Sequence, residues 1–263
     1  EKLAYVNMWG EVQAGDDAKF KQIVTPYLRS GYLIWQVNVF SIGGHVPAAM
    51  GIGDQIRTLQ TRTVTAYKEA VIHNNQRVGT GRTSCSFSEQ RNAGASSFVT
   101  IKPVMGHRWC TCESACFLIW ASGAVRQGGH VGIHRFYWKG PGFGNLSVEQ
   151  ARRQYEESQT EFVAYLKKLA VPQTIVDRLF ATDSHSMYYL TWPEHQLIQS
   201  TPYLEEMTYS RCGKSKTQPM SRENNWTRTE DANHIDCYRT VLKELMRDGS
   251  HKYLAGGDII KPN

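Results

Sequence analysis

One long apolar run, from Leu33 to Phe40, constrains the fold of this chain more than any other feature. It has the length of a strand and is apolar enough to be covered on both faces, as central strands of parallel sheets are. A Gly-Gly turn follows, and apolar residues then recur on one side of a helix over 45–59. Strand-like runs at 3–9 and 63–67 and a helical pattern over 16–30 complete the order. Alternating strands and helices predict an α/β fold with right-handed parallel crossovers.

Composition fits a globular protein of 263 residues, with 41% hydrophobic and 21% charged residues. A chain of this size buries a full core and forms either one large domain or one domain with appendages. No apolar run approaches the roughly 20 residues of a transmembrane helix, so we expect no integral membrane segment. The net charge of +6 comes from scattered residues rather than a basic stripe, so we expect no nucleic-acid partner.

The rest of the chain predicts one long helix and two polar regions. Residues 68–109 are rich in Gly, Ser, Thr and Asn and predict an insertion, such as a hairpin or lid, with a strand-like run at 97–104. Apolar residues recurring every seven positions predict an amphipathic helix over 147–170. Apolar content falls near residue 200, which predicts a domain over 1–200 and a C-terminal helical appendage over 201–263.

Six cysteines make an even number, which favours disulfides and an oxidising compartment. Cys212 and Cys237 flank a polar stretch, and a disulfide between them would contribute about 3 kcal/mol. This bond would fix the C-terminal appendage. Cys85 has two candidate partners, Cys110 and Cys112.

A zinc site is the alternative use of the cysteines. Cys110, Cys112 and Cys116, together with His107 or His130, could supply zinc ligands. The paired CxxC spacing that is typical of zinc sites is absent from the chain, which favours disulfides. We therefore expect no metal and no cofactor.

Ser114 and His134 are a candidate nucleophile and its base. Ser114 stands in Cys-Glu-Ser-Ala-Cys, before a short apolar helix that Gly123 can end. His134 ends a short apolar run 20 residues later. A serine on a tight turn and a histidine at a strand end can form a nucleophile–base pair. The alternative is structural, because serine is a common helix cap and a lone histidine near a core strand is usually packed.

The Gly43-Gly44 pair is a candidate binding turn. Main-chain N–H groups at such a turn face outward without a Cβ in the way, which suits a phosphate or a developing oxyanion. An ordinary tight turn needs the same residue type. A glycine-rich loop at 139–145 lacks the GxGxxG pattern, and GxxxxGK[ST] is absent from the chain, so no ATP-binding signature is present.

Taken together, these motifs resemble the ClpP-like serine peptidases of the ClpP/crotonase superfamily. Ser41-Ile-Gly-Gly44 resembles the family's Asn-Ser-Pro-Gly-Gly turn, and Cys112-Glu-Ser-Ala-Cys116 resembles its nucleophile segment. Val131-Gly-Ile-His-Arg135 resembles its Met-Ile-His-Gln, and Leu190-Thr-Trp-Pro-Glu-His resembles its Phe-Leu-Ser-Ala-Pro-Glu-Ala. The likeness covers about residues 3–200 without the insertion. The paired cysteines and the His-Arg form are more similar to an envelope-located bacterial branch.

The resemblance implies a repeated β-β-α spiral core with a long handle-type helix. It implies that Ser114 is the nucleophile and that His134 takes its proton. It also implies oxyanion-hole amides at Gly43, Gly44 and Ala115.

The third catalytic residue departs from the family's pattern. The ungapped position of the family's aspartate is Met187, and Asp183 is the carboxylate that could replace it. Otherwise a backbone carbonyl, a water or Ser186 would orient His134. Without a carboxylate, activity would fall by several orders of magnitude.

The resemblance implies a serine peptidase or hydrolase that acts on a peptide or protein and forms a homo-oligomer; any ATPase partner is left open. The N-terminus has neither an apolar signal core nor an initiator Met, so we expect a mature periplasmic or secreted form. Two alternatives use the same fold. One is a catalytically weak or inactive oligomeric scaffold, and the other is a crotonase-type acyl-CoA enzyme.

Overall fold

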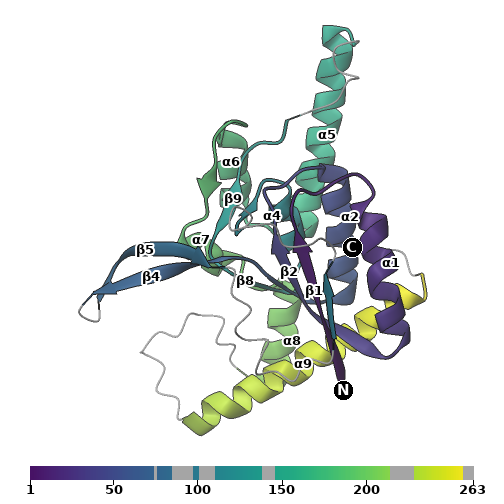
Figure 1. Cartoon of the computed structure of the whole chain (residues 1–263), viewed down its shortest axis with the longest axis vertical. Coiled ribbons are helices and arrows are strands. Elements are labelled where there is room, and N and C mark those ends of the chain that lie inside the picture. Colours follow the sequence, from purple (N-terminus) through teal and green to yellow (C-terminus); the bar gives the residue numbers. More distant parts are fainter. Residues whose placement is uncertain (74–75, 85–96, 101–109, 138–145, 214–227, 257–263) are drawn as a thin grey trace.

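A five-stranded parallel sheet lies at the centre of the molecule (Figure 1). The computed structural model describes the main chain of residues 1–73, 76–84, 97–100, 110–137, 146–213 and 228–256. Side chains are described for residues 1–66, 110–137, 146–213 and 232–256. The strand order is β6-β1-β2-β3-β8, with β1 Lys2–Trp9, β2 Tyr32–Phe40, β3 Arg62–Val64, β6 Ser97–Thr100 and β8 Val125–Gln127. The apolar run therefore forms β2, in the middle of a parallel sheet, which confirms the predicted α/β class.

Helices α1 (Asp16–Arg29) and α2 (Val46–Leu59) follow β1 and β2, as the sequence predicts, and lie side by side (Figure 1). Their apolar faces bury Phe20 and Ile52 in the same core cluster as Val37 of β2. Periodic apolar residues thus place both helices against one face of the sheet.

A second, smaller sheet carries the candidate nucleophile and base. Its strands are β7 (Cys112–Glu113), β9 (Val131–Ile133) and β10 (Tyr188–Tyr189), with β9 in the middle. β7 runs parallel to β9, whereas β10 runs antiparallel to it. An isolated bridge between Ser41 and Cys112 connects β7 to the end of β2. Two strand-to-helix turns, one after β2 and one after β7, therefore meet at this point.

Helix α5 (Val148–Lys168) is the predicted long helix and projects from the core (Figure 1). Its start is fixed by a capping box between Ser147 and Gln150. Its exposed first half contrasts with Phe162 and Leu166 near its end, which are buried in the main core. Two short helices follow, α6 (Gln173–Ala181) and α7 (Trp192–Leu197). Within the ranges described here, no helix is both long and apolar enough to cross a membrane.

A buried arginine in β8 of the central sheet connects the segments that follow three helices. Arg126 donates hydrogen bonds to the carbonyls of Gly123, Leu169 and Ile198, at 3.0, 2.7 and 3.0 Å. These carbonyls lie just beyond α4 (Cys116–Trp120), α5 and α7, where helices have unpaired acceptors. Burial, together with the nearby positive charge of Arg57, lowers the pKa of Arg126 to about 9.

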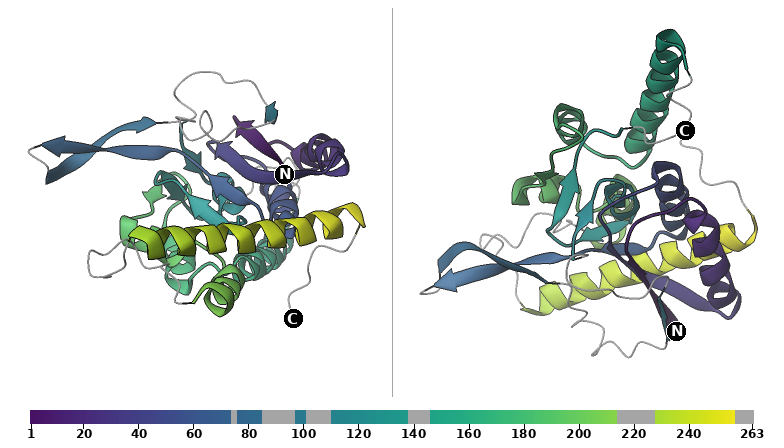
Figure 2. Two further views of the ribbon diagram at one scale, coloured as in Figure 1. Left: turned by 90° about the horizontal axis from the view of Figure 1, so that it is seen from below. Right: turned by 45° about the horizontal axis from the view of Figure 1, so that its top comes forward.

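The C-terminal segment contributes to the interior. Helix α8 (Pro202–Cys212) and helix α9 (Arg228–Leu254) are joined by the predicted Cys212–Cys237 disulfide, which is confirmed. α9 crosses beneath the sheet (Figure 2) and packs against α2. Apolar residues of α9 share a cluster with Leu33 of β2 and Val125 of β8; they are Val241, Leu242, Leu245 and Met246. The predicted appendage therefore covers part of the core, while the domain boundary itself stays a prediction.

The predicted insertion divides into two different structures. β4 (Tyr67–His73) and β5 (Gln76–Ser84) form an antiparallel hairpin that extends away from the body (Figure 2). β6, in contrast, pairs in parallel with β1 and is an edge strand of the central sheet. The run at 97–104 is thus a strand at its start, but a strand of the core sheet rather than of an inserted unit. Cys85 and the loop at 139–145 lie outside the described residues.

Candidate active site

Ser114 lies on a strained turn between β7 and α4. Its φ is 56°, in the left-handed region that residues with a Cβ rarely adopt. Such a conformation costs about 1–2 kcal/mol. The Ser114 N–H donates to the carbonyl of Gly132 at 3.0 Å, and the Ser114 carbonyl accepts from the N–H of Phe117 at 3.0 Å. The surrounding main chain therefore holds the serine where a strand passes into a helix, with its side chain half-buried.

A disulfide brackets this turn. Cys112, at the start of β7, is bonded to Cys116, the first residue of α4. This pairing excludes Cys112 as a partner of Cys85, and it removes both sulfurs as thiolate zinc ligands. Cys110 is also disulfide-bonded. Among the described side chains, no group of three or more His, Cys, Asp or Glu is placed to hold a metal ion.

The Gly-Gly turn after β2 packs directly against Ser114. The Ser41 N–H donates to the Thr111 carbonyl at 2.8 Å, and the Ser41 carbonyl accepts from the Glu113 N–H at 2.9 Å. A Cβ built on Gly43 would lie only 2.5 Å from the Ser114 Cβ. Gly43 also has a φ of 95°, which a side chain would strain. Only glycine fits this close approach, so the two turns contact each other at Ser114.

The three predicted oxyanion-hole amides differ in what they bind. The Gly43 N–H donates to the Ser41 hydroxyl at 3.0 Å and is therefore already used. Within the described part of the chain, the N–H groups of Gly44 and Ala115 make no hydrogen bond. These two amides, one from each turn, are the ones available to a ligand.

His134 follows β9, the strand beside β7. Its side chain is 8% exposed, and its Nδ1 lies 2.7 Å from the carbonyl oxygen of Arg135. A carbonyl oxygen only accepts, so Nδ1 carries the hydrogen and the neutral ring has its lone pair on Nε2. This is the tautomer that a general base needs. In the described residues, no hydrogen bond joins the Ser114 hydroxyl to His134 or to any other group.

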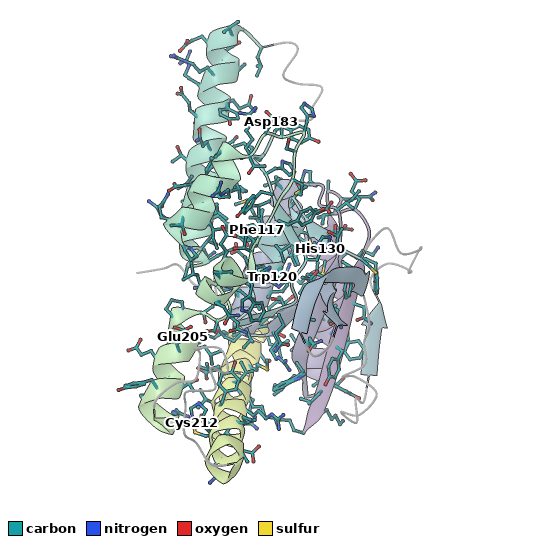
Figure 3. The ribbon with its side chains drawn as sticks, turned by 90° about the vertical axis from the view of Figure 1, so that its left-hand side faces the viewer. Phe117, Trp120, His130, Asp183, Glu205 and Cys212 are labelled. Carbon is teal, nitrogen blue, oxygen red and sulfur yellow. A yellow bond between two sulfur atoms is a disulfide. The ribbon has the colours of Figure 1, made fainter. Side chains whose placement is uncertain are left out.

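Asp183 has other partners than His134. Its carboxylate pairs with the Arg135 guanidinium at 2.5 Å and accepts the N–H of His185 at 2.9 Å. The His185 N–H and the Arg135 charge hold the pKa of Asp183 below its usual value. The side chain is 50% exposed, and Figure 3 shows it well apart from Phe117 of α4. The structure thus brings Asp183 to Arg135, whose carbonyl takes the Nδ1 hydrogen of His134.

Met187, at the ungapped position of the family's aspartate, lies against β9. A Cβ built on Gly132 would be 2.7 Å from the Met187 sulfur and 3.0 Å from the Glu113 Cγ. Gly132 is therefore covered by one side chain from each neighbouring segment. The methionine supplies packing at a position where the resembled family has a charge.

Four side chains beside Ser114 form a cluster that no sequence motif indicates. Glu113 accepts hydrogen bonds from the Thr111 hydroxyl at 2.8 Å and from the Tyr189 hydroxyl at 2.5 Å. Burial, followed by the bond to Glu113, raises the pKa of Tyr189 above its usual value. The His130 ring stacks on Tyr189, with centroids 4.4 Å apart. Only a weak signal for this cluster is present in the sequence. Thr111 and Glu113 are two positions apart, and residues so spaced in an extended segment lie on the same face.

Polar contacts hold the last residue of α4, Trp120, in place. The Trp120 indole N–H donates to the Gln127 carbonyl at 2.9 Å, and the Trp120 carbonyl accepts from the Thr63 hydroxyl at 2.6 Å. His195 meets the Trp120 ring edge-on, with centroids 5.5 Å apart. Burial lowers the pKa of His195 to about 4, although Glu194 opposes the shift. The α4 helix therefore packs against buried groups that carry no charge.

Comparisons with known proteins do not assign the chain to a family. No family model matches it, and no curated protein matches it. One similar solved structure is a serine-to-alanine mutant of the 1510-N membrane-bound stomatin-specific protease, with 14% identity, a TM-score of 0.43, and coverage of 83% of this chain and 89% of that chain. Another is a lysine-to-alanine mutant of that protease in complex with a substrate peptide, with 12% identity, a TM-score of 0.43, and coverage of 80% and 82%. Similarities of this size are too low to transfer a fold or an activity.

Proposed function

We propose that this protein is a serine hydrolase that transfers the acyl group of a peptide or protein to Ser114, with His134 as base. The observation that carries the proposal is the Ser114 turn itself. Ser114 is held at positive φ between a strand and a buried helix, in contact with Gly43 of a second turn. Strained backbone of this kind clusters at active sites. A serine that served only as a helix cap would need no such conformation.

In the proposed reaction, His134 Nε2 takes the proton of Ser114 as its Oγ attacks the acyl carbon. The N–H groups of Gly44 and Ala115 stabilise the negative charge that develops on the carbonyl oxygen. Protonated His134 then gives its proton to the leaving amine. A water, deprotonated by His134, releases the acyl group and restores Ser114. Each oxyanion donor contributes about 3–4 kcal/mol to the transition state.

The proposed machinery is a dyad rather than a triad. The Arg135 carbonyl, at 2.7 Å from Nδ1, orients the His134 ring in place of a carboxylate. The proposed dyad does not use Asp183, whose carboxylate pairs with the Arg135 guanidinium. A carbonyl stabilises an imidazolium less than a carboxylate does, so we expect turnover well below that of a complete triad.

The proposed setting is the periplasm or the exterior of the cell. The Cys112–Cys116 and Cys212–Cys237 disulfides support an oxidising compartment. The proposal also includes a ClpP/crotonase-like spiral core and assembly into a homo-oligomer. The projecting first half of α5 supports the assembly, because it leaves a long helical face outside the core.

A fluorophosphonate probe tests the proposal. The probe should label the folded protein, and peptide mapping should find the adduct on Ser114. Labelling should disappear in Ser114→Ala and persist in Ser210→Ala, which removes an exposed hydroxyl on α8. A folded wild-type protein that takes up no label would refute the assignment.

A non-catalytic scaffold on the same fold is the second candidate. The free Ser114 hydroxyl and the lack of a carboxylate at His134, both within the described residues, favour it. It predicts that Ser114→Ala retains full cellular function. A crotonase-type enzyme would instead use the Gly44 and Ala115 amides to polarise a thioester, and a coenzyme A binding assay would detect it.

A further inference from the structure

The disulfide at the candidate site closes a very short ring. Cys112 and Cys116 are separated by 4 positions, with Ser114 midway between them, and their Cα atoms lie 5.2 Å apart. Both side chains are 0% exposed. One belongs to β7, which pairs with β9, and the other begins α4. The covalent bond therefore connects the strand to the helix directly across the serine.

Ser114 has an unusual place among the strained residues of the described chain. Gln60 and Ala170 also have positive φ, at 53° and 55°, but both follow the last turn of a helix. Left-handed residues are common at that position because they complete the C-terminal cap. Ser114 instead precedes a helix. Helix capping does not account for its conformation, and another restraint must hold it.

The main-chain contacts of Ser114 are few. Its N–H bonds to Gly132 on one side, and its carbonyl receives the N–H of Phe117 on the other. Contact with Gly43 limits the space around its Cβ but does not select its φ. The disulfide is the covalent link between the two ends of the turn, Cys112 and Cys116. A cross-link acts mainly by removing alternative conformations, and the alternatives here include every relaxed form of the turn.

We propose that the Cys112–Cys116 disulfide positions Ser114, so that its reduction by a dithiol relaxes the turn and lowers acyl transfer. This inference rests on the proposed function of Ser114. Cys112 and Cys116 are positioning residues, because they act through the serine and touch no substrate. Oxidation would restore the working conformation, which makes the site responsive to the redox state of its compartment.

The chemical step is a thiol–disulfide exchange. A thiolate of the dithiol attacks one sulfur of the pair, breaks the bond between Cys112 and Cys116, and forms a mixed disulfide. The second thiol of the reductant resolves it. Two electrons and two protons pass from the dithiol to the protein, which gains two cysteine thiols, while the reductant becomes a disulfide. Because both sulfurs are buried, the reductant reaches them only when the turn opens, so exchange should be slow.

The first test compares two paired-cysteine variants. Cys112→Ala/Cys116→Ala removes the disulfide at Ser114, and Cys212→Ala/Cys237→Ala removes the one between α8 and α9. We expect fluorophosphonate labelling of Ser114 to fall about 100-fold in the first variant, since a misplacement of about 1 Å has that effect, and to stay at the wild-type rate in the second. Circular dichroism establishes that each variant is folded. A folded first variant that labels at the wild-type rate would overturn the inference.

The second test uses wild-type protein and reads the conformation of Ser114 directly. The ¹³Cα and ¹³Cβ shifts of Ser114, assigned by comparison with Ser114→Ala, report its backbone conformation. We expect the oxidised protein to give the shifts of a left-handed residue. Dithiothreitol should move them toward right-handed or extended values, and reoxidation should return them. Shifts that are the same in both redox states would refute the inference.

The two tests separate this inference from the proposed function. If the oxidised protein takes up no label, the hydrolase assignment fails, while the Ser114 shifts still decide whether the disulfide holds the turn. If the oxidised protein labels and reduction changes neither the rate nor the shifts, the hydrolase assignment survives and the redox inference fails.

Discussion

The Ser114 turn and the Asp183 segment both carry residues expected to serve catalysis, yet the fold fixes them in different ways. Ser114 is held by two paired strands, a disulfide and contact with Gly43. Asp183 is half exposed, and its side-chain partner is a half-exposed arginine, Arg135. Exposed ion pairs contribute only about 0–1 kcal/mol. The difference indicates that the main chain, rather than a third side chain, organises the candidate site.

Replacing His134 should have the largest effect on the Ser114 side of this comparison. His134→Gln keeps a polar side chain but removes the base, so we expect the rate of fluorophosphonate labelling to fall by roughly 10³–10⁴-fold. His185→Gln is the matched control, because His185 is an exposed histidine beside Asp183. Equal labelling rates in His134→Gln and the wild type would exclude His134 as the base.

A steric clash between the two turns should have the second-largest effect on labelling. In Gly43→Ala the added methyl group would meet the Ser114 Cβ, so we expect labelling to fall roughly 100-fold. Gly31→Ala is the control for backbone strain alone. Gly31 also has a positive φ, of 78°, but no atom lies within 4 Å of the added group. If both variants label equally slowly, strain rather than the collision with Ser114 explains the loss.

Acid should lower the stability of the protein through the buried His195, which packs against α4, the helix after Ser114. His195 has a pKa of about 4 in the folded protein, against 6.5 as its ordinary value. Between these values the unfolded chain binds the proton more readily, so the free energy of unfolding should fall as the pH decreases from 6.5 to 4. The loss should reach about 3 kcal/mol. Urea unfolding at several pH values measures it.

His195→Phe tests whether His195 causes this pH dependence of the free energy of unfolding. The substitution keeps a ring beside Trp120 but removes the titrating group, so the stability of the variant should depend less on pH over the same range. His185→Gln, on the exposed side, should keep the wild-type dependence. An unchanged slope in His195→Phe would assign the acid sensitivity to other groups.

Replacing Asp183 should have the smallest effect. Asp183→Asn removes its charge from the exposed Arg135 pair and leaves the His134 hydrogen bond to the main chain in place. We expect labelling of Ser114 to stay within about twofold of the wild-type rate, whereas a triad aspartate contributes about 10⁴-fold. A loss approaching the triad value would show that Asp183 reaches His134 during the reaction.

Much of the fold could be predicted from the sequence, because apolar periodicity reports which faces are buried. β2, α2 and α5 were predicted in this way. The strand at 97–100 and the C-terminal helix were expected as elements, but the places of β6 and α9 in the core were harder to predict, since both pack on partners distant in sequence, β1 and α2. No local pattern carries information of that kind.

Candidate residues for the site could be named from the sequence, but the contacts and the disulfide that join them could not. Ser114 and His134 stand in recognisable motifs, and Gly43 is required by a contact that only the folded chain reveals. The Cys112–Cys116 pairing spans the turn at Ser114, whose positive φ only the folded chain reveals. Counting cysteines could therefore not select it from the alternatives.

The central claim is that the Arg135 carbonyl, and not a carboxylate, orients His134 as a base. A long-range ¹H–¹⁵N spectrum of the neutral His134 ring tests it most directly. We predict that Nδ1 carries the hydrogen and Nε2 is bare, with the same spectrum in Asp183→Asn. A hydrogen on Nε2, or a change of tautomer when Asp183 is replaced, would contradict the account.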